Sequence, residues 1–158
     1  MGAGMKDVSD VLPEFTGIER RFDIHLNNGD VLVIDDYAHN PHKIACLMEA
    51  VSAIKERACY IFQPHGYGPT RLMKDEYIRT FAGHLRKADH LVLLPIYYPG
   101  GTVAKDISSG DLAEGIRAGG GSAEALKERA EVFQKIGGWE AYVVMGARDE
   151  TLSGLAVE

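Results

Sequence analysis

Four short apolar runs recur along the chain, and segments with helical spacing lie between them. The runs occupy residues 31–34, 58–62, 90–96 and 141–145. Apolar runs of this length, bounded by turn residues, are typical of strands that are covered on both faces. Strands that alternate with helices predict an α/β fold with a doubly wound, mostly parallel sheet and helices on both of its faces.

Turn and capping residues set the limits of the predicted elements. Asn27, Asn28 and Gly29 separate two strand-like segments, 21–26 and 30–35, and predict a hairpin-like strand pair near the N-terminus. Asn40 is a good N-cap and Pro41 suits the first helical position, so a helix is expected from there to about residue 55. Further helices are predicted over residues 70–85, 107–116 and 123–136.

Polar side chains follow the first core strand directly. Asp35, Asp36, Tyr37 and His39 come after the apolar run 31–34 and before the helix that Asn40 caps. Open α/β sheets bind ligands at the carboxyl ends of their strands, and a helix N-terminus favours phosphate or carboxylate. The segment therefore predicts a binding site.

The ends of the other predicted strands carry similar residues. Parallel strands place their carboxyl ends at one edge of the sheet, so all four ends should share one rim. The segments concerned are 35–39, 63–67 with His65 and Tyr67, 96–98 with two tyrosines, and 146–149 with Arg148 and Asp149.

Composition narrows the class of protein. The chain has 158 residues, 46% of them hydrophobic, which suits one domain over residues 15–158 after a flexible N-terminal segment or cloning remnant at 1–14. A net charge of -6 argues against nucleic acid as a partner, and no window is apolar enough for a membrane span. Cys46 and Cys59 lack metal-type spacing and are expected to be buried thiols, which fits a cytoplasmic protein.

Five motifs in order resemble those of the Mur ligase C-terminal domain. The resemblance is closest to the alanine-adding branch, or to a divergent paralogue of it, and it extends from about residue 15 to the end of the chain. The motifs are residues 18–22, 33–41, 62–65 with Thr70 and Arg71, 97–101, and 145–149.

This resemblance implies a Rossmann-like domain that forms part of a larger enzyme of peptidoglycan precursor synthesis. Its partners would be an N-terminal UDP-sugar domain, a central ATPase domain and a small amino-acid substrate. ATP and Mg²⁺ would be the cofactors, held mostly by the central domain. The present chain contains no Gly-x-x-x-x-Gly-Lys-[Ser/Thr] loop, so on its own it is expected to be inactive.

The resemblance also implies roles for individual residues. Arg21 resembles an arginine that reaches ATP phosphate when the domains close, and either Asp35 or Asp36 resembles the aspartate that binds the ribose. Tyr37 and His39 would line the nucleotide cleft. The residues expected at the incoming amino acid are His65, Tyr67 and Arg71. No residue of this domain is expected to be catalytic, and none to bind a metal.

The chain departs from the pattern of the alanine-adding branch after His65. Gly66 and Pro69 stand where polar or basic side chains are usual, and Arg148 stands in place of a usual glycine. These departures leave the amino acid unassigned, and Arg148 adds a charge to the rim.

Other interpretations compete with this one. The chain could be a stand-alone nucleotide- or amino-acid-binding module without ligase activity. A small metal-dependent hydrolase that uses the Asp and His side chains of the rim is a third possibility. Asp35 and Asp36 could also serve only as turn and capping residues, and Arg20 and Arg21 could both be ordinary surface charge.

Overall fold

The core of the protein is one six-stranded sheet. The computed structural model describes residues 2, 4–14, 17–135 and 137–157. The strand order is β1-β2-β6-β3-β4-β5, with β1 antiparallel to β2 and the other neighbours parallel. The strands are β1 (Asp23–Asn27), β2 (Leu32–Asp36), β3 (Ala58–Gln63), β4 (His90–Leu93), β5 (Ala123–Ala125) and β6 (Ala141–Gly146). The predicted α/β fold with a mostly parallel sheet is confirmed.

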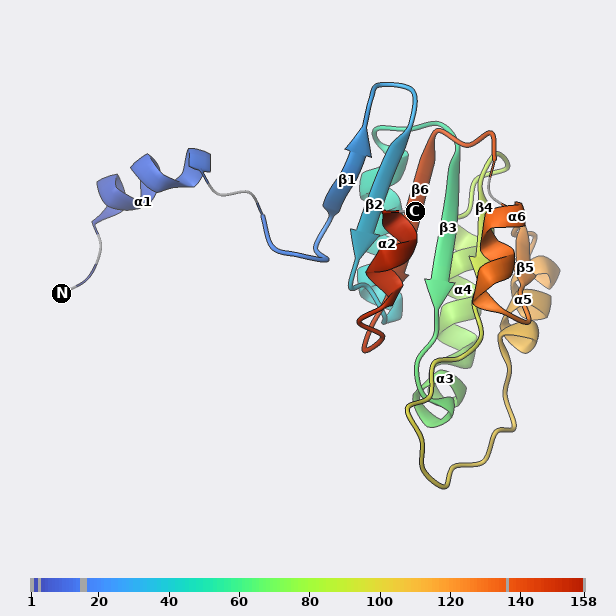
Figure 1. Cartoon of the computed structure of the whole chain (residues 1–158). Helices are drawn as coiled ribbons and strands as arrows, with labels where there is room; N and C mark the ends of the chain where they lie inside the picture. The colour runs from blue at the N-terminus through green and yellow to red at the C-terminus, as the bar shows by residue number, and fades with distance from the viewer. Residues whose placement is uncertain (1, 3, 15–16, 136, 158) are drawn as a thin grey trace.

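Helices cover both faces of this sheet, as predicted (Figure 1). Three long helices, α2 (Pro41–Ser52), α4 (Lys74–His84) and α5 (Ser109–Ala118), pack on one face around Phe62, whose ring lies 5.4 Å from those of both Tyr77 and Phe81. The other face is covered by short elements, namely η2 (Arg129–Glu131), α6 (Val132–Lys135) and η3 (Leu152–Ala156).

Helix α2 begins where the sequence predicts. The side chain of Asn40 accepts a hydrogen bond from the backbone N–H of Lys43 at 3.0 Å, and Pro41 occupies the first helical position. Apolar side chains at helical spacing are buried against the sheet: Ile44, Leu47, Met48 and Val51. The helix ends at Ser52, short of the expected residue 55.

The predicted hairpin is also confirmed. Gly29 adopts a φ of 92° in the turn, a conformation that glycine reaches without steric cost. Asp23 pairs with Asp35 across the two strands, and the register shifts at a bulge between Ile24 and Leu26. The hairpin thereby brings the segment before β1 next to the carboxyl end of β2.

The single helix expected over residues 70–85 is wrong in its bounds. The chain forms two helices, α3 (Tyr67–Leu72) and α4, which meet at Met73. Met73 leaves the helical region of φ and ψ, at -98° and 9°, and its side chain packs against the core. Tertiary packing at this residue overrides a helical pattern that would otherwise continue.

The helix expected over residues 123–136 is wrong as well. Residues Ala123–Ala125 form β5, which pairs in parallel with β4 through Leu91 and Leu93. An alanine-rich edge strand of three residues has no distinctive pattern, and its pairing with β4 decides its conformation. Only the short elements η2 and α6 follow it, and residue 136 lies outside the described part of the chain.

The described part of the N-terminal segment forms two short helical elements. Helix α1 (Met5–Val11) and η1 (Leu12–Glu14) bury none of their side chains, and α1 projects away from the sheet (Figure 1). The predicted domain boundary at residue 15 falls on a residue outside the described ones and stays a prediction. Within the described residues, no helix has the length and apolarity that a bilayer crossing requires.

Candidate functional site

The carboxyl ends of the parallel strands meet at one edge of the sheet. His39 follows β2 there, His65 follows β3, and Arg148 follows β6. His65 forms a parallel bridge with Tyr97 after β4, and the backbone N–H of Gly66 donates to the Tyr97 carbonyl at 2.8 Å. The structure thus brings the predicted rim residues together from four strand ends.

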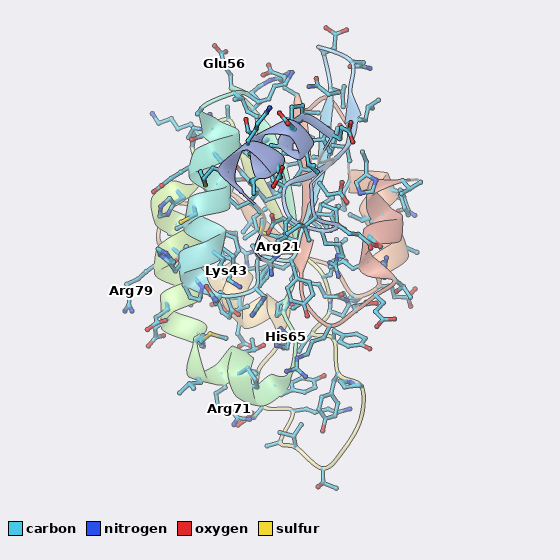
Figure 2. All side chains as sticks on the ribbon, turned by 90° about the vertical axis from the view of Figure 1, so that its left-hand side faces the viewer. Arg21, Lys43, Glu56, His65, Arg71 and Arg79 are labelled. Carbon is cyan, nitrogen blue, oxygen red and sulfur yellow. The ribbon has the colours of Figure 1, made fainter. Side chains whose placement is uncertain are left out.

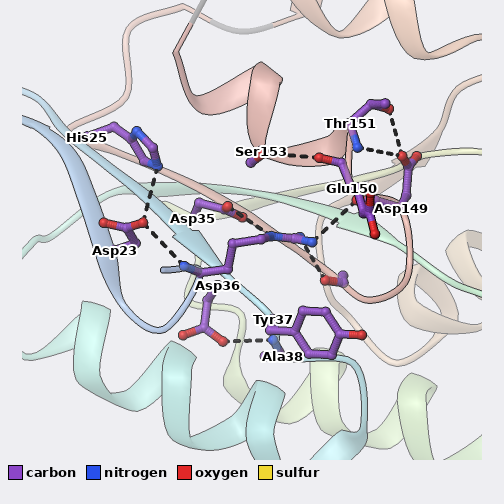
Figure 3. Close-up of polar contacts among 12 residues, drawn as sticks. Asp23, His25, Asp35, Asp36, Tyr37, Ala38, Asp149, Glu150, Thr151 and Ser153 are labelled. Carbon is purple, nitrogen blue, oxygen red and sulfur yellow. Dashed lines mark hydrogen bonds and ion pairs between the residues drawn. The ribbon is translucent and has the colours of Figure 1, made fainter. Parts of the chain in front are cut away.

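Arg20 holds this edge together from the segment before β1. Its Nε lies 3.0 Å from Oδ2 of Asp35, and its Nη2 donates to the carbonyl oxygen of Gly146 at 2.9 Å. A further bond of 3.3 Å runs from Nη1 to the carbonyl oxygen of Asp149. Figure 3 shows Asp35 and Asp149 converging at this point. The interpretation of Arg20 as ordinary surface charge is therefore wrong.

Asp35 is fully buried within this network. Its second carboxylate oxygen, Oδ1, has no hydrogen-bond partner among the described residues. Burial raises the pKa of Asp35 above its ordinary value, and the Arg20 guanidinium opposes that rise. Asp35 consequently serves as the counter-ion of Arg20, with no surface left for a ligand.

Asp36 is only partly buried, but it also has a structural task. Its Oδ1 accepts a hydrogen bond from the backbone N–H of Ala38, and its Oδ2 accepts one from that of Phe22, both at 2.7 Å. The contact with Ala38, drawn in Figure 3, fixes the turn after β2, and the contact with Phe22 joins this turn to the segment before β1. Of the two aspartates, Asp36 is the one with part of its surface exposed.

Tyr37 and His39 form the floor of the rim. The Arg20 guanidinium lies 5.3 Å from the centre of the Tyr37 ring, and the Tyr37 hydroxyl accepts a hydrogen bond of 3.3 Å from the backbone N–H of Arg148. The His39 ring packs edge-on against Tyr37 at 5.4 Å and against His65 at 5.5 Å. The predicted nucleotide-side residues and His65 are thus direct neighbours.

Nδ1 of His39 lies 2.8 Å from the Tyr37 carbonyl oxygen, so it carries the proton and donates. In contrast, Nδ1 of His65 is buried without a partner among the described residues. Burial lowers the pKa of His65, and the neighbouring His39 and Arg148 lower it further. Because its pKa is lowered, His65 is neutral at physiological pH, and its Nδ1 is enclosed by surrounding atoms.

Arg21 differs from its neighbour Arg20 in being exposed. It lines a cavity of about 530 Å³ together with Arg20, Tyr37, Glu150 and other residues. Its guanidinium makes no hydrogen bond or ion pair to any residue that the structure describes, whereas that of Arg20 is fully engaged. Figure 2 shows Arg21 and His65 on the side of the molecule that α1 faces.

Tyr67 and Arg71 both lie on α3. Tyr67 packs edge-on against Tyr98 at 5.4 Å. Arg71 binds the loop between β4 and α5 through the carboxylate of Asp106 and, at 3.0 Å, the carbonyl oxygen of Ala104. Arg71 lies on the same helix as Tyr67, one turn further along, and it is not among the residues that line the cavity at His65.

A second, smaller cavity of about 280 Å³ opens beside His65. Aromatic and proline side chains line most of it, and Arg148 is its cation; the full lining is His65, Gly66, Pro69, Tyr97, Tyr98, Pro99 and Arg148. The strand order in the sequence predicted that residues 96–98 share a rim with His65, and the bridge between His65 and Tyr97 agrees with that prediction. Pro99 joins the lining of the same cavity.

Among the described residues, the cysteines are free and the acidic side chains form no metal-type cluster. Cys46 is exposed and Cys59 is buried, and both are free, so the expectation that both thiols are buried is wrong for Cys46. Within residues 2, 4–14, 17–135 and 137–157, no group of three His, Cys, Asp or Glu side chains is arranged to hold a metal ion.

Comparisons with known proteins agree with the resemblance found in the sequence. Residues 20–148 match the family model of the Mur ligase, glutamate ligase domain. A UDP-N-acetylmuramate--L-alanine ligase of Desulfosudis oleivorans is 32% identical to this chain over 94% of its length. The match covers 33% of that relative, so the chain spans about a third of the length of the curated relative.

Solved structures share the fold. The UDP-N-acetylmuramate-alanine ligase from Thermotoga maritima superposes with a TM-score of 0.71 at 25% identity, over 98% of this chain and 33% of that one. A bifunctional folylpolyglutamate synthase/dihydrofolate synthase from Yersinia pestis, complexed with AMPPNP and Mn ion, has a TM-score of 0.61. The superposition covers 98% of this chain and 34% of the synthase chain. At 17% sequence identity, this likeness shows the fold alone.

Proposed function

Because this chain belongs to the Mur ligase family and corresponds to the C-terminal domain of its members, we propose a role in an ATP-dependent amide ligase. In that enzyme the domain would close over the nucleotide and present the amino acid. The acceptor would be a UDP-N-acetylmuramate-type carboxylate in peptidoglycan precursor synthesis. The printed activity of the relatives, UDP-N-acetylmuramate--L-alanine ligase, supports this substrate class.

The observation that carries the proposal is the contrast between the two adjacent arginines. Arg20 is bound by Asp35 and two backbone carbonyls, while Arg21 is exposed on the cavity beside Tyr37. A permanently charged, planar guanidinium without an internal partner is suited to a phosphate. Arg21 would therefore bind ATP phosphate when this domain meets the central one.

The proposed reaction is the transfer of the ATP γ-phosphoryl group to the acceptor carboxylate, followed by attack of the amine, which displaces phosphate and leaves an amide. Within this domain, Tyr37 and His39 would line the nucleotide cleft. Because Asp35 is buried, the partly exposed Asp36 is the aspartate that would bind the ribose. Mg²⁺ would be held by the central domain, since the described residues here present no cluster of metal ligands.

The partners follow from this assignment. They would be the central ATPase domain and the N-terminal UDP-sugar domain of the same enzyme, with a small amino acid as substrate. We expect a cytoplasmic enzyme that uses neither nucleic acid nor membrane as a partner. The isolated 158-residue chain should bind ATP weakly or not at all, because the central domain would supply most contacts with the phosphates. Submicromolar ATP binding by this chain in calorimetry would contradict that assignment.

The test uses the whole protein encoded by the reading frame that contains this chain. Arg21→Ala should raise its apparent KM for ATP at least tenfold, since a charge-assisted hydrogen bond is worth about 1.5–3 kcal/mol. Arg79→Ala, which removes an exposed arginine on α4 far from the rim, is the matched control (Figure 2). An unchanged KM for ATP in Arg21→Ala would remove this residue from the nucleotide site.

A further inference from the structure

His42 and Cys46 lie side by side on the exposed face of α2. They are four residues apart, which places their side chains one helical turn apart on the same face. Nε2 of His42 lies 3.9 Å from Sγ of Cys46, and both residues are exposed. The other face of the helix packs on the sheet, so the core does not need either side chain. An imidazole nitrogen and a free thiol therefore meet at the surface.

The separation of these two atoms is close to the one that a zinc ion requires of its ligands. Tetrahedral zinc binds cysteine sulfur at about 2.3 Å and histidine nitrogen at about 2.0–2.1 Å, which sets the two ligand atoms about 3.6 Å apart. A small rotation of one side chain closes the difference from the observed 3.9 Å. A pair of ligands four residues apart on a helix is also the spacing that helical zinc sites use.

Nearby side chains of the same chemical types have other partners. Oε1 of Glu49, one turn after Cys46, lies 3.4 Å from Nε2 of His84. Nδ1 of His39, one turn before His42, donates to the Tyr37 carbonyl oxygen at 2.8 Å. Across the part of the chain that the structure describes, no group of three metal-type ligands occurs. The pair on α2 thus supplies two protein ligands and leaves the remaining coordination positions open.

A second copy of the chain can supply the missing ligands. Structural zinc sites are almost always four-coordinate, and two cysteines with two histidines are one of their common ligand sets. Two chains related by a two-fold axis through the ion would provide that set from two identical pairs. The row of side chains beyond the thiol continues with the exposed Ala50, whose small side chain leaves room for a close approach.

The charges of α2 also suit a second copy. A two-fold axis that crosses the helices would make the two α2 helices antiparallel. Glu49, whose side chain is exposed, would then stand level with the first turn of the other helix. The N-terminus of a helix favours a carboxylate at that position.

We propose that His42 and Cys46 form half of a zinc site, and that two copies of the chain share one Zn²⁺ through both pairs. Each Cys46 thiol would lose its proton to solvent when Sγ binds the ion, and each His42 would bind through the neutral ring at Nε2. Neither residue belongs to the candidate site described above, so this inference is independent of the proposed ligase function.

The test is a titration of the 158-residue chain with Zn²⁺, followed by calorimetry and light scattering. Binding should saturate at one ion for two chains, and the molar mass should double at that point. EDTA should return the molar mass to its starting value. A phosphine reductant is present throughout, so that a disulfide between two Cys46 residues does not account for the dimer. Co²⁺ in place of Zn²⁺ should give the absorption bands of a tetrahedral ion with thiolate ligands.

Cys46→Ser and His42→Ala should each weaken Zn²⁺ binding and abolish the doubling of the molar mass. Loss of a hydrogen bond to a metal ligand alone costs about 10–100-fold in affinity, so loss of a ligand should cost at least as much. Both variants should fold as the wild type does, because both positions are exposed. Cys46→Ser retains Cys59, so loss of the cobalt bands in it assigns them to Cys46.

His84→Gln is the matched control, because it removes a histidine from the neighbouring helix α4. It should leave both the affinity and the molar mass unchanged. Three results would overturn the inference: no saturable Zn²⁺ binding by the folded chain, saturation at one ion per chain without a dimer, or binding that neither Cys46→Ser nor His42→Ala weakens. None of them bears on the ligase assignment, which the ATP experiment with Arg21→Ala tests separately.

Discussion

The guanidinium of Arg20 lies 3.0 Å from a carboxylate oxygen of Asp35, whose side chain is fully buried. The same guanidinium reaches the backbone carbonyls of Gly146 and Asp149. One side chain thus ties the segment before β1 to β2 and to the loop after β6. That tie leaves the adjacent Arg21 facing outward at the cavity beside Tyr37.

Replacing Arg20 with methionine should destabilise the fold strongly. Breaking a buried ion pair leaves an unpaired charge and costs about 3–5 kcal/mol. Because Asp35 would then be charged in an apolar site, its pKa should rise further, and the loss should shrink as acid protonates it. Urea unfolding at several pH values measures this loss.

Arg21→Met is the control for that experiment and should change the free energy of unfolding by less than about 0.5 kcal/mol. The double variant Arg20→Met with Asp35→Asn should regain part of the stability lost in the single one. Equal effects of the Arg20 and Arg21 substitutions would contradict the division of roles between the two residues.

Gly146→Ala should destabilise the protein by about 1–3 kcal/mol, the usual cost of overpacking. Gly146 has a φ of 153°, and an added Cβ would lie 2.9 Å from the backbone carbonyl oxygen of Gln63. The shift that this requires would also move the carbonyl that binds Arg20. Gly154→Ala, where the new Cβ meets nothing within 4 Å, should be neutral or slightly stabilising. Thermal unfolding of both variants decides the point.

The pKa of His65 should lie below the ordinary histidine value of about 6.5 in an NMR titration of its ring. Arg148→Gly should raise it only part of the way, since burial, the largest cause, remains. In the pH range between the folded and unfolded pKa, the unfolded chain binds more protons at this residue. The contribution of His65 to the free energy of unfolding is therefore complete above about pH 6.5, and it falls as the pH drops below that value. A His65 pKa that Arg148→Gly lowers would refute this arrangement.

Arg71→Ala should loosen the loop between β4 and α5 with little effect on global stability. The pair with Asp106 is exposed, so its loss should cost no more than about 1 kcal/mol. Hydrogen exchange should nevertheless become faster for the amides of residues 102–106, because Arg71 also binds the Ala104 carbonyl oxygen. Unchanged exchange in this loop would show that Arg71 does not hold it.

Local signals in the sequence were sufficient for much of the fold. Asn40 and Pro41 fixed the start of α2, Gly29 marked the hairpin turn, and the apolar runs located four of the strands. Each of these signals acts through nearby residues. The strand β5 and the break at Met73 depend instead on contacts with distant segments, which leave no local pattern.

The same distinction applies to the candidate site. The order of elements predicted that His39, His65 and Arg148 would share an edge, and the structure places them there. Which of two adjacent arginines forms the internal ion pair depends on a partner 15 residues away in the chain, Asp35. The engagement of Arg71 depends on Asp106, 35 residues away, and could not be foreseen from its own motif.

The most direct test of the account is phosphate release by the whole protein encoded by this reading frame, measured with ATP, Mg²⁺ and UDP-N-acetylmuramate. Phosphate release should require both the acceptor and a small amino acid, and one amide should form for each phosphate released. A folded protein that binds ATP but releases no phosphate in response to any amino acid would contradict it. A reading frame that encodes only this domain, without a glycine-rich phosphate loop, would do so as well.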